Sequence, residues 1–331
     1  MRRPFLTAFC LVLLGVSLPH AQSPDNAALA ARGESPTAVV HQTQFKGAVA
    51  LVALDVCVKN RDGNPTQGLQ PEDFLILENE VPQRIALFSI GGHVPIAVAL
   101  LVDNSRSMFG EALEQAKVAA ARFIDILRPD DLVEVMSFNE RANLRYELGP
   151  DHDRAKVSLN DVFATGATRL YETVLVAVRH LEHAQRRRTT EYRNVIIVLS
   201  DGEDTHSRLP FDDVLEEVRR SGVLVYTISL RTKHRAQPDA PPLWQMNLLA
   251  YDTGGRAIAL RDLAGLTKTY EDINTELINL YRIGYVPSNA VHDGSWRAIS
   301  IRVPSATLVV RSRSGYYAPR FTPAVSRPST R

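Results

Sequence analysis

The pattern of apolar and polar positions changes near residue 93. Before it, short apolar runs such as 49–58 are separated by turn clusters such as 61–65, which predicts β-strands. After it, unbroken apolar runs such as 94–102 alternate with amphipathic segments such as 111–127. Unbroken runs are typical of strands buried on both faces, so the alternation predicts a parallel α/β sheet. From residue 286 the pattern returns to short strands.

These changes divide the chain into six segments. We expect a signal peptide at 1–21, a flexible lead-in at 22–44, an N-terminal β region at 45–92, an α/β domain at 93–285, a C-terminal β segment at 286–318 and a loose tail at 319–331. Each β flank alone has too few strands to bury a stable core, so we expect the two to pack together. The predicted fold is a doubly wound, mostly parallel sheet with helices on both faces, flanked by a small β-sandwich built from N- and C-terminal strands.

The N-terminus has the order of a secretory signal. Arg2 and Arg3 precede an apolar stretch at 5–18, and Ala21 offers a small residue for cleavage. We therefore expect an exported protein, periplasmic or extracellular. A short anchoring helix is the alternative, and no later segment is long and apolar enough to span a membrane.

Composition and cysteine content exclude few classes of function. A formal net charge of +1 over 331 residues does not point to any class of partner, and an exported chain without a recognition module predicts no nucleic-acid partner. After cleavage Cys57 alone remains, which excludes an internal disulfide. Its place in an alternating strand predicts a small buried apolar residue rather than a reactive thiol.

The most informative chemistry follows the apolar run at 94–102. Asp103 ends that run, and two hydroxyls follow at Ser105 and Ser107. An acid at the C-terminal end of a buried strand lies at the edge where open α/β sheets bind ligands. Alternate spacing in an extended turn lets the three side chains point the same way. An all-oxygen set of this kind suits a hard cation such as Mg²⁺.

A second strand repeats this arrangement. Asp201 follows the apolar run at 195–199, and a loop of small residues ending in Thr168 lies between the two acids in the chain. An unpaired buried carboxylate costs several kcal/mol, so a shared cation is the expected partner of both acids. Helix capping is the alternative for each residue alone, because Ser, Thr and Asp are favoured caps in any fold.

Together the three loops resemble those of von Willebrand factor type A domains with a metal-ion-dependent adhesion site. The matching motifs are D-N-S-R-S at 103–107, G-A-T at 166–168 and S-D-G at 200–202. The resemblance covers about residues 93 to 285. It implies that the hydroxyls of Ser105, Ser107 and Thr168 bind the ion, and that Asp103 and Asp201 bind it directly or through water.

The same resemblance implies a binding function in which no covalent bond is made or broken. One Mg²⁺ or Mn²⁺ ion would keep a position for an acidic group, Asp or Glu, of a partner protein, as in an adhesion or interaction module. The flanks look like a bacterial group of exported type A-related proteins that is common in acidobacteria. The segments that carry this second resemblance are 68–74, Glu78 with Gln83, and 313–318. It implies architecture more than activity.

Other residues near the motifs have weaker signals. Asn104, Glu203 and Asp204 are candidates for hydrogen bonds to the ligands rather than to the ion. For the last two, together with His206, a solvated loop is the alternative. His180 and His183 lie one helical turn apart, which predicts a surface pair rather than a zinc site, since no further ligands follow.

Enzyme motifs are missing from the chain after the signal segment. It contains no G-x-S-x-G elbow, no P-loop and no H-E-x-x-H, and we expect no enzyme. Two alternatives to the metal-dependent binding module remain. One is an envelope scaffold that works without metal, and the other is a hydrolase that uses the ion as a Lewis acid, for which no convincing general base accompanies the acids.

Overall fold

The computed structural model describes residues 51–91, 94–201, 204, 206–230 and 243–320. The expected signal peptide, the lead-in, Glu203 and the tail after Arg320 lie outside the described residues. Within the described part, no helix combines the length and the apolar character needed to cross a membrane.

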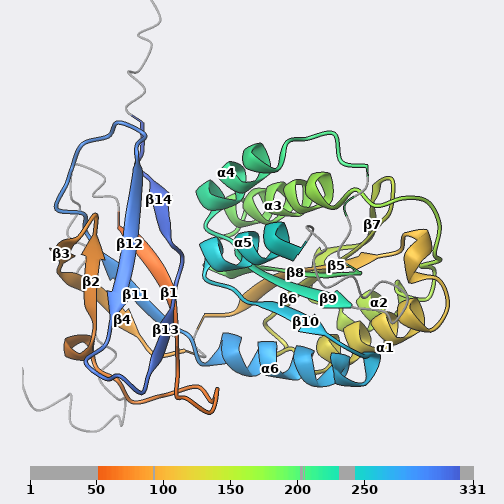
Figure 1. Ribbon diagram of the computed structural model, residues 1–331, viewed down its shortest axis with the longest axis horizontal. Coiled ribbons are helices and arrows are strands. Elements are labelled where there is room, and N and C mark those ends of the chain that lie inside the picture. Colours follow the sequence, from red (N-terminus) through yellow and green to blue (C-terminus); the bar gives the residue numbers. More distant parts are fainter. Residues whose placement is uncertain (1–50, 92–93, 202–203, 205, 231–242, 321–331) are drawn as a thin grey trace, which may run out of the picture. The chain divides into compact units, whose positions relative to one another are not determined.

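A six-stranded sheet forms the centre of the α/β region, in the order β10-β9-β8-β5-β6-β7 (Figure 1). Its strands are β5 (Ile96–Asp103), β6 (Leu132–Phe138), β7 (Ala142–Gly149), β8 (Arg193–Ser200), β9 (Leu224–Leu230) and β10 (Ala257–Leu260). All neighbours are parallel except β6 and β7. Every residue of β5, β6 and β9 is buried, as unbroken apolar runs predict for a sheet covered on both faces.

Helices cover both faces of this sheet. They are α1 (Glu111–Asp125), α2 (His152–Val157), α3 (Leu170–Arg186), α4 (Phe211–Ser221), α5 (Leu243–Thr253) and α6 (Leu266–Ile278), with short 3₁₀ turns η2 (Arg106–Met108) and η4 (Leu263–Gly265). A further 3₁₀ turn, η1 (Pro71–Asp73), precedes β2 in the N-terminal flank. Val98, Leu100 and Val102 of β5 pack with α1, α2 and α6, whereas Ala97 and Leu101 pack with α3, α4 and α5. The doubly wound fold is therefore confirmed.

The flanks form two antiparallel sheets of four strands each among the described residues, in the orders β13-β1-β11-β4 and β14-β12-β2-β3. The strands are β1 (Val52–Lys59), β2 (Leu75–Glu78), β3 (Val81–Gln83), β4 (Ile85–Ser89), β11 (Tyr281–Tyr285), β12 (Trp296–Arg302), β13 (Val309–Arg311) and β14 (Gly315–Tyr317). N-terminal β2 pairs with C-terminal β12, and side chains from both ends of the chain share one core that includes Phe74, Tyr281 and Ile299. The predicted sandwich of N- and C-terminal strands is confirmed.

Strand β11 spans the last residues of the segment expected at 93–285. Its hydrogen bonds go to β1 and β4 of the flanking sheet, with Arg282 opposite Ser89. The segments that lead into and out of the α/β region touch at Gly91. A Cβ atom there would lie 2.4 Å from the carbonyl oxygen of Ile278 and 2.8 Å from that of Leu280, so this close approach requires glycine.

A buried carboxylate organises the core of the sandwich. Glu78 of β2 receives hydrogen bonds from the hydroxyls of Tyr285 (2.7 Å) and Tyr316 (2.9 Å), and its Oε1 lies 3.2 Å from a guanidinium nitrogen of Arg297. Glu78 and Arg297 are both almost completely buried. Arg297 also donates to the carbonyl oxygens of two residues in the segment before β12. The carboxylate and the terminal nitrogens of this ion pair therefore have partners, as buried charges require, while Arg297 Nε has no acceptor among the described residues.

A second buried carboxylate joins helix α6 to the strands beside it. Glu276 forms an ion pair with Lys59 Nζ (2.7 Å) and accepts hydrogen bonds from the hydroxyl of Tyr226 (2.7 Å) and from Arg311. Burial alone would raise the pKa of Glu276, but the charges of Arg311 and Lys59 outweigh it and lower the pKa. Nearby, Arg193 of β8 donates to the carbonyl oxygen of the last-turn residue of α6 at 2.9 Å.

Candidate metal centre at the carboxyl edge of the sheet

Asp103, the last residue of β5, is the buried centre of the candidate site. Its carboxylate accepts hydrogen bonds from the backbone N–H of Ser105 (2.8 Å) and from the hydroxyl of Ser200 (2.6 Å). Burial raises the pKa of Asp103 to about 6, although these donors lower it, and the charge of Asp201 adds to the rise. The two carboxylates at the ends of β5 and β8 therefore lie close enough to repel each other.

The two serine hydroxyls that follow lie side by side. Ser105 Oγ and Ser107 Oγ are 3.0 Å apart, so both point to the same side of the loop. Ser105 is buried, whereas Ser107, in the 3₁₀ turn η2, is exposed. The site is therefore closed on the side of the sheet and open at Ser107.

The threonine loop is fastened to this first loop by its backbone. Thr165 N–H donates to Asn104 O (2.8 Å), and Arg106 N–H donates to Gly166 O (3.0 Å). Gly166 has a φ of +74°, a conformation that side chains other than glycine rarely adopt. Thr168 then follows as a buried residue two positions before the first residue of α3.

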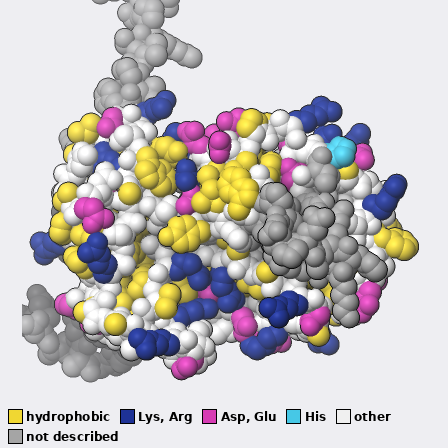
Figure 2. Space-filling view, viewed as in Figure 1, with side chains coloured by type: hydrophobic (Ala, Val, Ile, Leu, Met, Phe, Trp, Pro, Cys, Tyr) yellow, Lys and Arg dark blue, Asp and Glu magenta, His cyan; other side chains and the backbone are white. Residues whose placement is uncertain are grey.

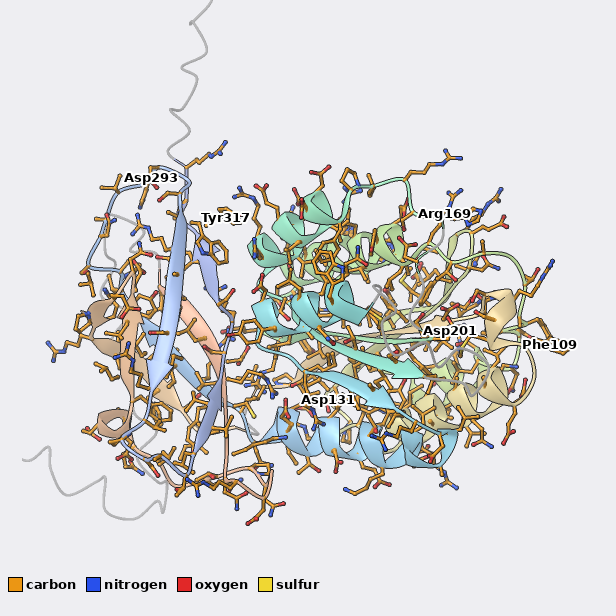
Figure 3. The ribbon with its side chains drawn as sticks, viewed as in Figure 1. Phe109, Asp131, Arg169, Asp201, Asp293 and Tyr317 are labelled. Atoms are coloured by element: carbon orange, nitrogen blue, oxygen red, sulfur yellow. The ribbon has the colours of Figure 1, made fainter. Side chains whose placement is uncertain are left out.

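The third loop begins at Asp201, directly after β8, and is also tied to the threonine loop. His206 N–H donates to Thr168 O at 3.0 Å. Asp201 is partly buried and lies at the same end of the α/β region as Phe109 and Arg169 (Figure 3). Hydrogen bonds thus bring together all three loops that carry the predicted ligands.

The three residues expected to support the ligands have different positions. Asn104 is buried, and its side-chain N–H donates to Phe163 O (2.7 Å), so it holds the first loop to the segment before the threonine loop. Asp204 Oδ1 accepts from Leu170 N–H (3.3 Å), so Asp204 caps helix α3. Glu203 lies outside the described residues.

Two serines that hydrogen-bond to the site or to the start of α3 were not among the predicted site residues. Ser200 donates to Asp103, and Ser207 Oγ accepts from the N–H of Tyr171 in the first turn of α3. The signal for Ser200 was its place at the end of the apolar run at 195–199. The sequence carries no comparable signal for Ser207, because it approaches α3 from a distant loop.

The donor set fits a hard divalent cation. It consists of two carboxylates and three hydroxyls, all oxygen, and a cation would offset the repulsion between Asp103 and Asp201. Among the described residues, no three His, Cys, Asp or Glu side chains come together as a metal cluster. The candidate centre therefore depends on hydroxyl oxygens, which suit Mg²⁺ or Mn²⁺ better than softer ions.

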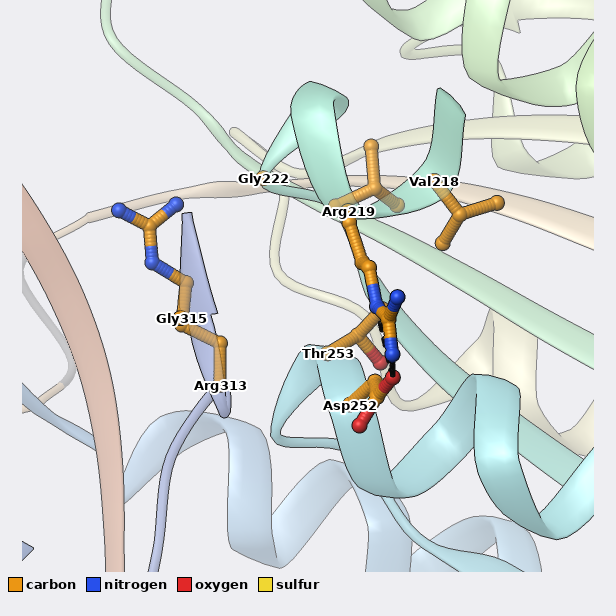
Figure 4. Close-up of a pocket in the computed structure, with 8 residues that line it drawn as sticks. Val218, Arg219, Gly222, Asp252, Thr253, Arg313 and Gly315 are labelled. Carbon is orange, nitrogen blue, oxygen red and sulfur yellow. Dashed lines mark hydrogen bonds and ion pairs between the residues drawn. The ribbon is translucent and has the colours of Figure 1, made fainter. Parts of the chain in front are cut away.

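A separate hollow lies between α4, the end of α5 and β14 (Figure 4). Arg219 and Asp252 form an ion pair on its wall, with Arg219 Nε 2.8 Å from Asp252 Oδ2, and Arg313 lines it as well. Its volume of about 10 Å³ admits about one water molecule. The hollow therefore has no room for an organic substrate.

Comparison with known proteins points to one family. The sequence model of the von Willebrand factor type A domain matches residues 97–271. Inter-alpha-trypsin inhibitor heavy chain H4 of Sus scrofa is 24% identical over 229 residues, which cover 66% of this chain and 24% of that protein. The uncharacterized protein sll0103 of Synechocystis is 30% identical over 115 residues, 34% of this chain and 26% of that protein. The chain thus spans about a quarter of the length of these curated relatives.

Solved structures show the same fold. The von Willebrand factor type A structure from Catenulispora acidiphila superposes with a TM-score of 0.50 at 14% identity, covering 81% of this chain and 74% of the other.

Proposed function

This chain belongs to the von Willebrand factor type A domain family, and from that premise we propose that it is a non-enzymatic binding module that holds one divalent cation. In this proposal Asp103, Ser105, Ser107, Thr168 and Asp201 hold Mg²⁺ or Mn²⁺. The bound ion supplies a positive charge that receives an Asp or Glu carboxylate of a partner protein.

The observation that supports this proposal best is the convergence of three loops on Asp103. Ser200 reaches Asp103 from the neighbouring strand, and backbone hydrogen bonds join the loops at Gly166 and Thr168. Loops fastened in this way lose little conformational freedom when an ion binds. The site is in this sense preorganised.

The buried and the exposed residues of the proposed site have different roles. Asp103 is completely buried, so it contributes charge to the ion and has no route to a partner. Ser107 is exposed and marks the side from which a carboxylate can approach. In this proposal the carboxylate of Asp103 is bound to the ion and buried, so it does not act as a general base toward a bound molecule, which supports a binding role over a hydrolytic one.

We also propose that the module works outside the cytoplasm, in the periplasm or beyond the cell. The support is the charged, apolar and small-residue order of residues 1–21. Mass spectrometry of the protein recovered from its native envelope tests this, and an intact N-terminus at Met1 in a cytoplasmic fraction would contradict it.

Calorimetric titration with Mn²⁺ and Mg²⁺ tests the ion site directly. We expect one ion per chain for the native protein, and loss of binding in Asp103→Ala and Asp201→Ala. The matched control is Asp213→Ala, which removes an exposed carboxylate on α4 and should bind the ion normally. Native-like ion binding by Asp103→Ala would refute the proposed site. A partner captured equally well in chelator would refute the proposed mechanism.

A further inference from the structure

Arg169 follows Thr168 directly, so its side chain starts beside the candidate ion site. Its backbone N–H donates to Asn139 O (2.8 Å), which fixes it next to the end of β6. The side chain is partly buried, and its Nε is shielded from solvent without a hydrogen-bond acceptor among the described residues. A shielded N–H that lacks an acceptor costs free energy, so this guanidinium is suited to an anionic ligand.

The side chain of Arg169 is not required to cap the N-terminus of helix α3. Asp204 Oδ1 accepts from Leu170 N–H (3.3 Å), and Ser207 Oγ accepts from Tyr171 N–H (3.2 Å). The first turn of α3 is therefore capped from the third loop. A guanidinium has only donors and cannot serve as an N-terminal cap.

Among the described residues, Glu172 in the first turn of α3 is a carboxylate whose pKa the charge of Arg169 lowers. Burial raises the pKa of Glu172, but hydrogen bonds from Arg208 and Ser207 and the charge of Arg169 lower it overall. Glu172 Oε1 is engaged by the backbone N–H of Arg208 at 2.6 Å. Arg169 and Glu172 form no ion pair in the described structure, so the guanidinium remains available to a ligand.

Three further arginines lie exposed on the loops around Arg169. They are Arg106, Arg141 and Arg208, and within the described structure none of them forms an ion pair. Acidic residues on these loops include Glu140, whose side chain lies against Gly166, and Asp204, which caps α3. Figure 2 shows Lys and Arg side chains along the upper right edge of the molecule in that view. Positive charge around a binding site attracts acidic partners and speeds their association.

We propose that Arg169 receives a second acidic side chain of the partner, next to the one that the ion receives. The ligand is then a protein segment with two nearby carboxylates rather than one. This inference rests on the proposed ion-dependent function and adds to it the class of partner. Arg169 is a specificity-determining residue in this scheme, and Arg106, Arg141 and Arg208 strengthen the attraction at long range.

Short synthetic peptides test the proposal. The probes are Gly–Ser hexapeptides with one glutamate, or with two glutamates separated by zero to three residues, titrated into the full chain with saturating Mn²⁺. We expect the best two-glutamate peptide to bind about tenfold more tightly than the one-glutamate peptide. Arg169→Gln should remove that advantage and leave binding of Mn²⁺ and of the one-glutamate peptide unchanged. Arg169→Lys should restore part of it.

The control is Arg179→Gln, which removes an exposed arginine of α3, about 15 Å along the helix from the partly buried Arg169 at its start. It should bind every peptide as the native chain does. Equal affinity for one- and two-glutamate peptides, no peptide binding to the Mn²⁺-loaded protein, or equal weakening of both peptides by Arg169→Gln would overturn the proposal. So would Arg169-dependent binding of a sulfated oligosaccharide without peptide binding. Failure of Mn²⁺ to bind would instead refute the ion site itself.

Discussion

Ser200 at the end of β8 donates a hydrogen bond of 2.6 Å to Asp103 at the end of the neighbouring parallel strand β5. This bond connects two motifs that are 97 residues apart in the chain. It stabilises the ionised form of a carboxylate whose pKa burial raises to about 6. Ser200 therefore helps keep Asp103 ready for a cation without being one of the proposed ligands.

Replacing Ser200 should weaken the ion site without abolishing it. We expect Ser200→Ala to lower Mn²⁺ affinity about tenfold, because residues that hydrogen-bond to metal ligands typically contribute that much. Calorimetry at pH 7 measures this. Ser158→Ala is the control, since it also removes a serine hydrogen bond, to Ala155 O, but away from the site. Unchanged affinity in Ser200→Ala would mean that the bond has no role in ion binding.

The metal-free protein should become more stable, through Asp103, as the pH falls from 7 to 5. The pKa of Asp103 is about 6 in the folded chain, whereas its ordinary value, which applies to the unfolded chain, is 3.8. Between pH 6 and pH 3.8 the folded chain therefore binds the proton more tightly than the unfolded chain does. Urea unfolding in chelator should show this rise in the native chain and a smaller one in Asp103→Asn. Identical pH profiles for the two proteins would contradict the raised pKa.

The buried pair of Glu78 and Arg297 should be costly to break. Glu78→Gln leaves Arg297 without its counter-charge inside the sandwich, and we expect a loss of about 3–5 kcal/mol in the free energy of unfolding. Glu80→Gln breaks an exposed pair with Arg302 and should cost less than about 1 kcal/mol. Urea unfolding of both variants measures the difference, and similar losses would argue against a special role for the buried pair.

Glu276 should respond to acid in the opposite sense to Asp103. Although burial opposes it, Arg311 and Lys59 lower the pKa of Glu276 below 4.5, so its contribution to stability is present above pH 4.5 and is lost as the pH falls below it. We expect Glu276→Gln to lose about 3 kcal/mol at pH 7. The gap from the native chain should narrow at about pH 3 if both proteins remain folded. A gap that widens in acid would contradict this assignment.

Cys57 should be unreactive while the protein is folded. Its side chain is 4% exposed, and burial raises the pKa of its thiol to about 11. In a Cys10→Ser background at pH 8, a thiol-specific chromogenic reagent should label no cysteine until urea unfolds the chain. Rapid labelling without denaturant would show that β1 opens locally in the native state.

The strands that are most completely buried were the ones predicted best from the sequence. The unbroken apolar runs that became β5 and β8 carry Asp103 and Asp201 at their ends, so the patterns predicted both the sheet and the edge where the acids lie. The longest strand that the apolar pattern did not predict is β7. It is only partly buried, and its sequence, with Arg145 and Glu147 among apolar residues, lacks a clean alternation.

Local hydrogen bonds explain another difference. The apolar pattern at 153–163 predicts one helix of that length, whereas α2 ends at Val157, and Ser158 Oγ donates to Ala155 O in the turn that follows. Contacts between loops were harder still to predict. Nothing in the local sequence indicates that Ser207 caps α3 or that Arg169 has a shielded Nε.

Gly91 touches the backbone at Ile278 and Leu280, where the chain returns from α6 to the sandwich. The two ends of the α/β domain therefore meet, and the domain is an insertion between β4 and β11 of a host sandwich. An inserted domain whose two ends lie close together can be lost, gained or exchanged during evolution without distorting the sandwich that carries it. A tight turn between Ser89 and Arg282 could thus replace the whole domain, and domains of other specificity could be grafted at the same point.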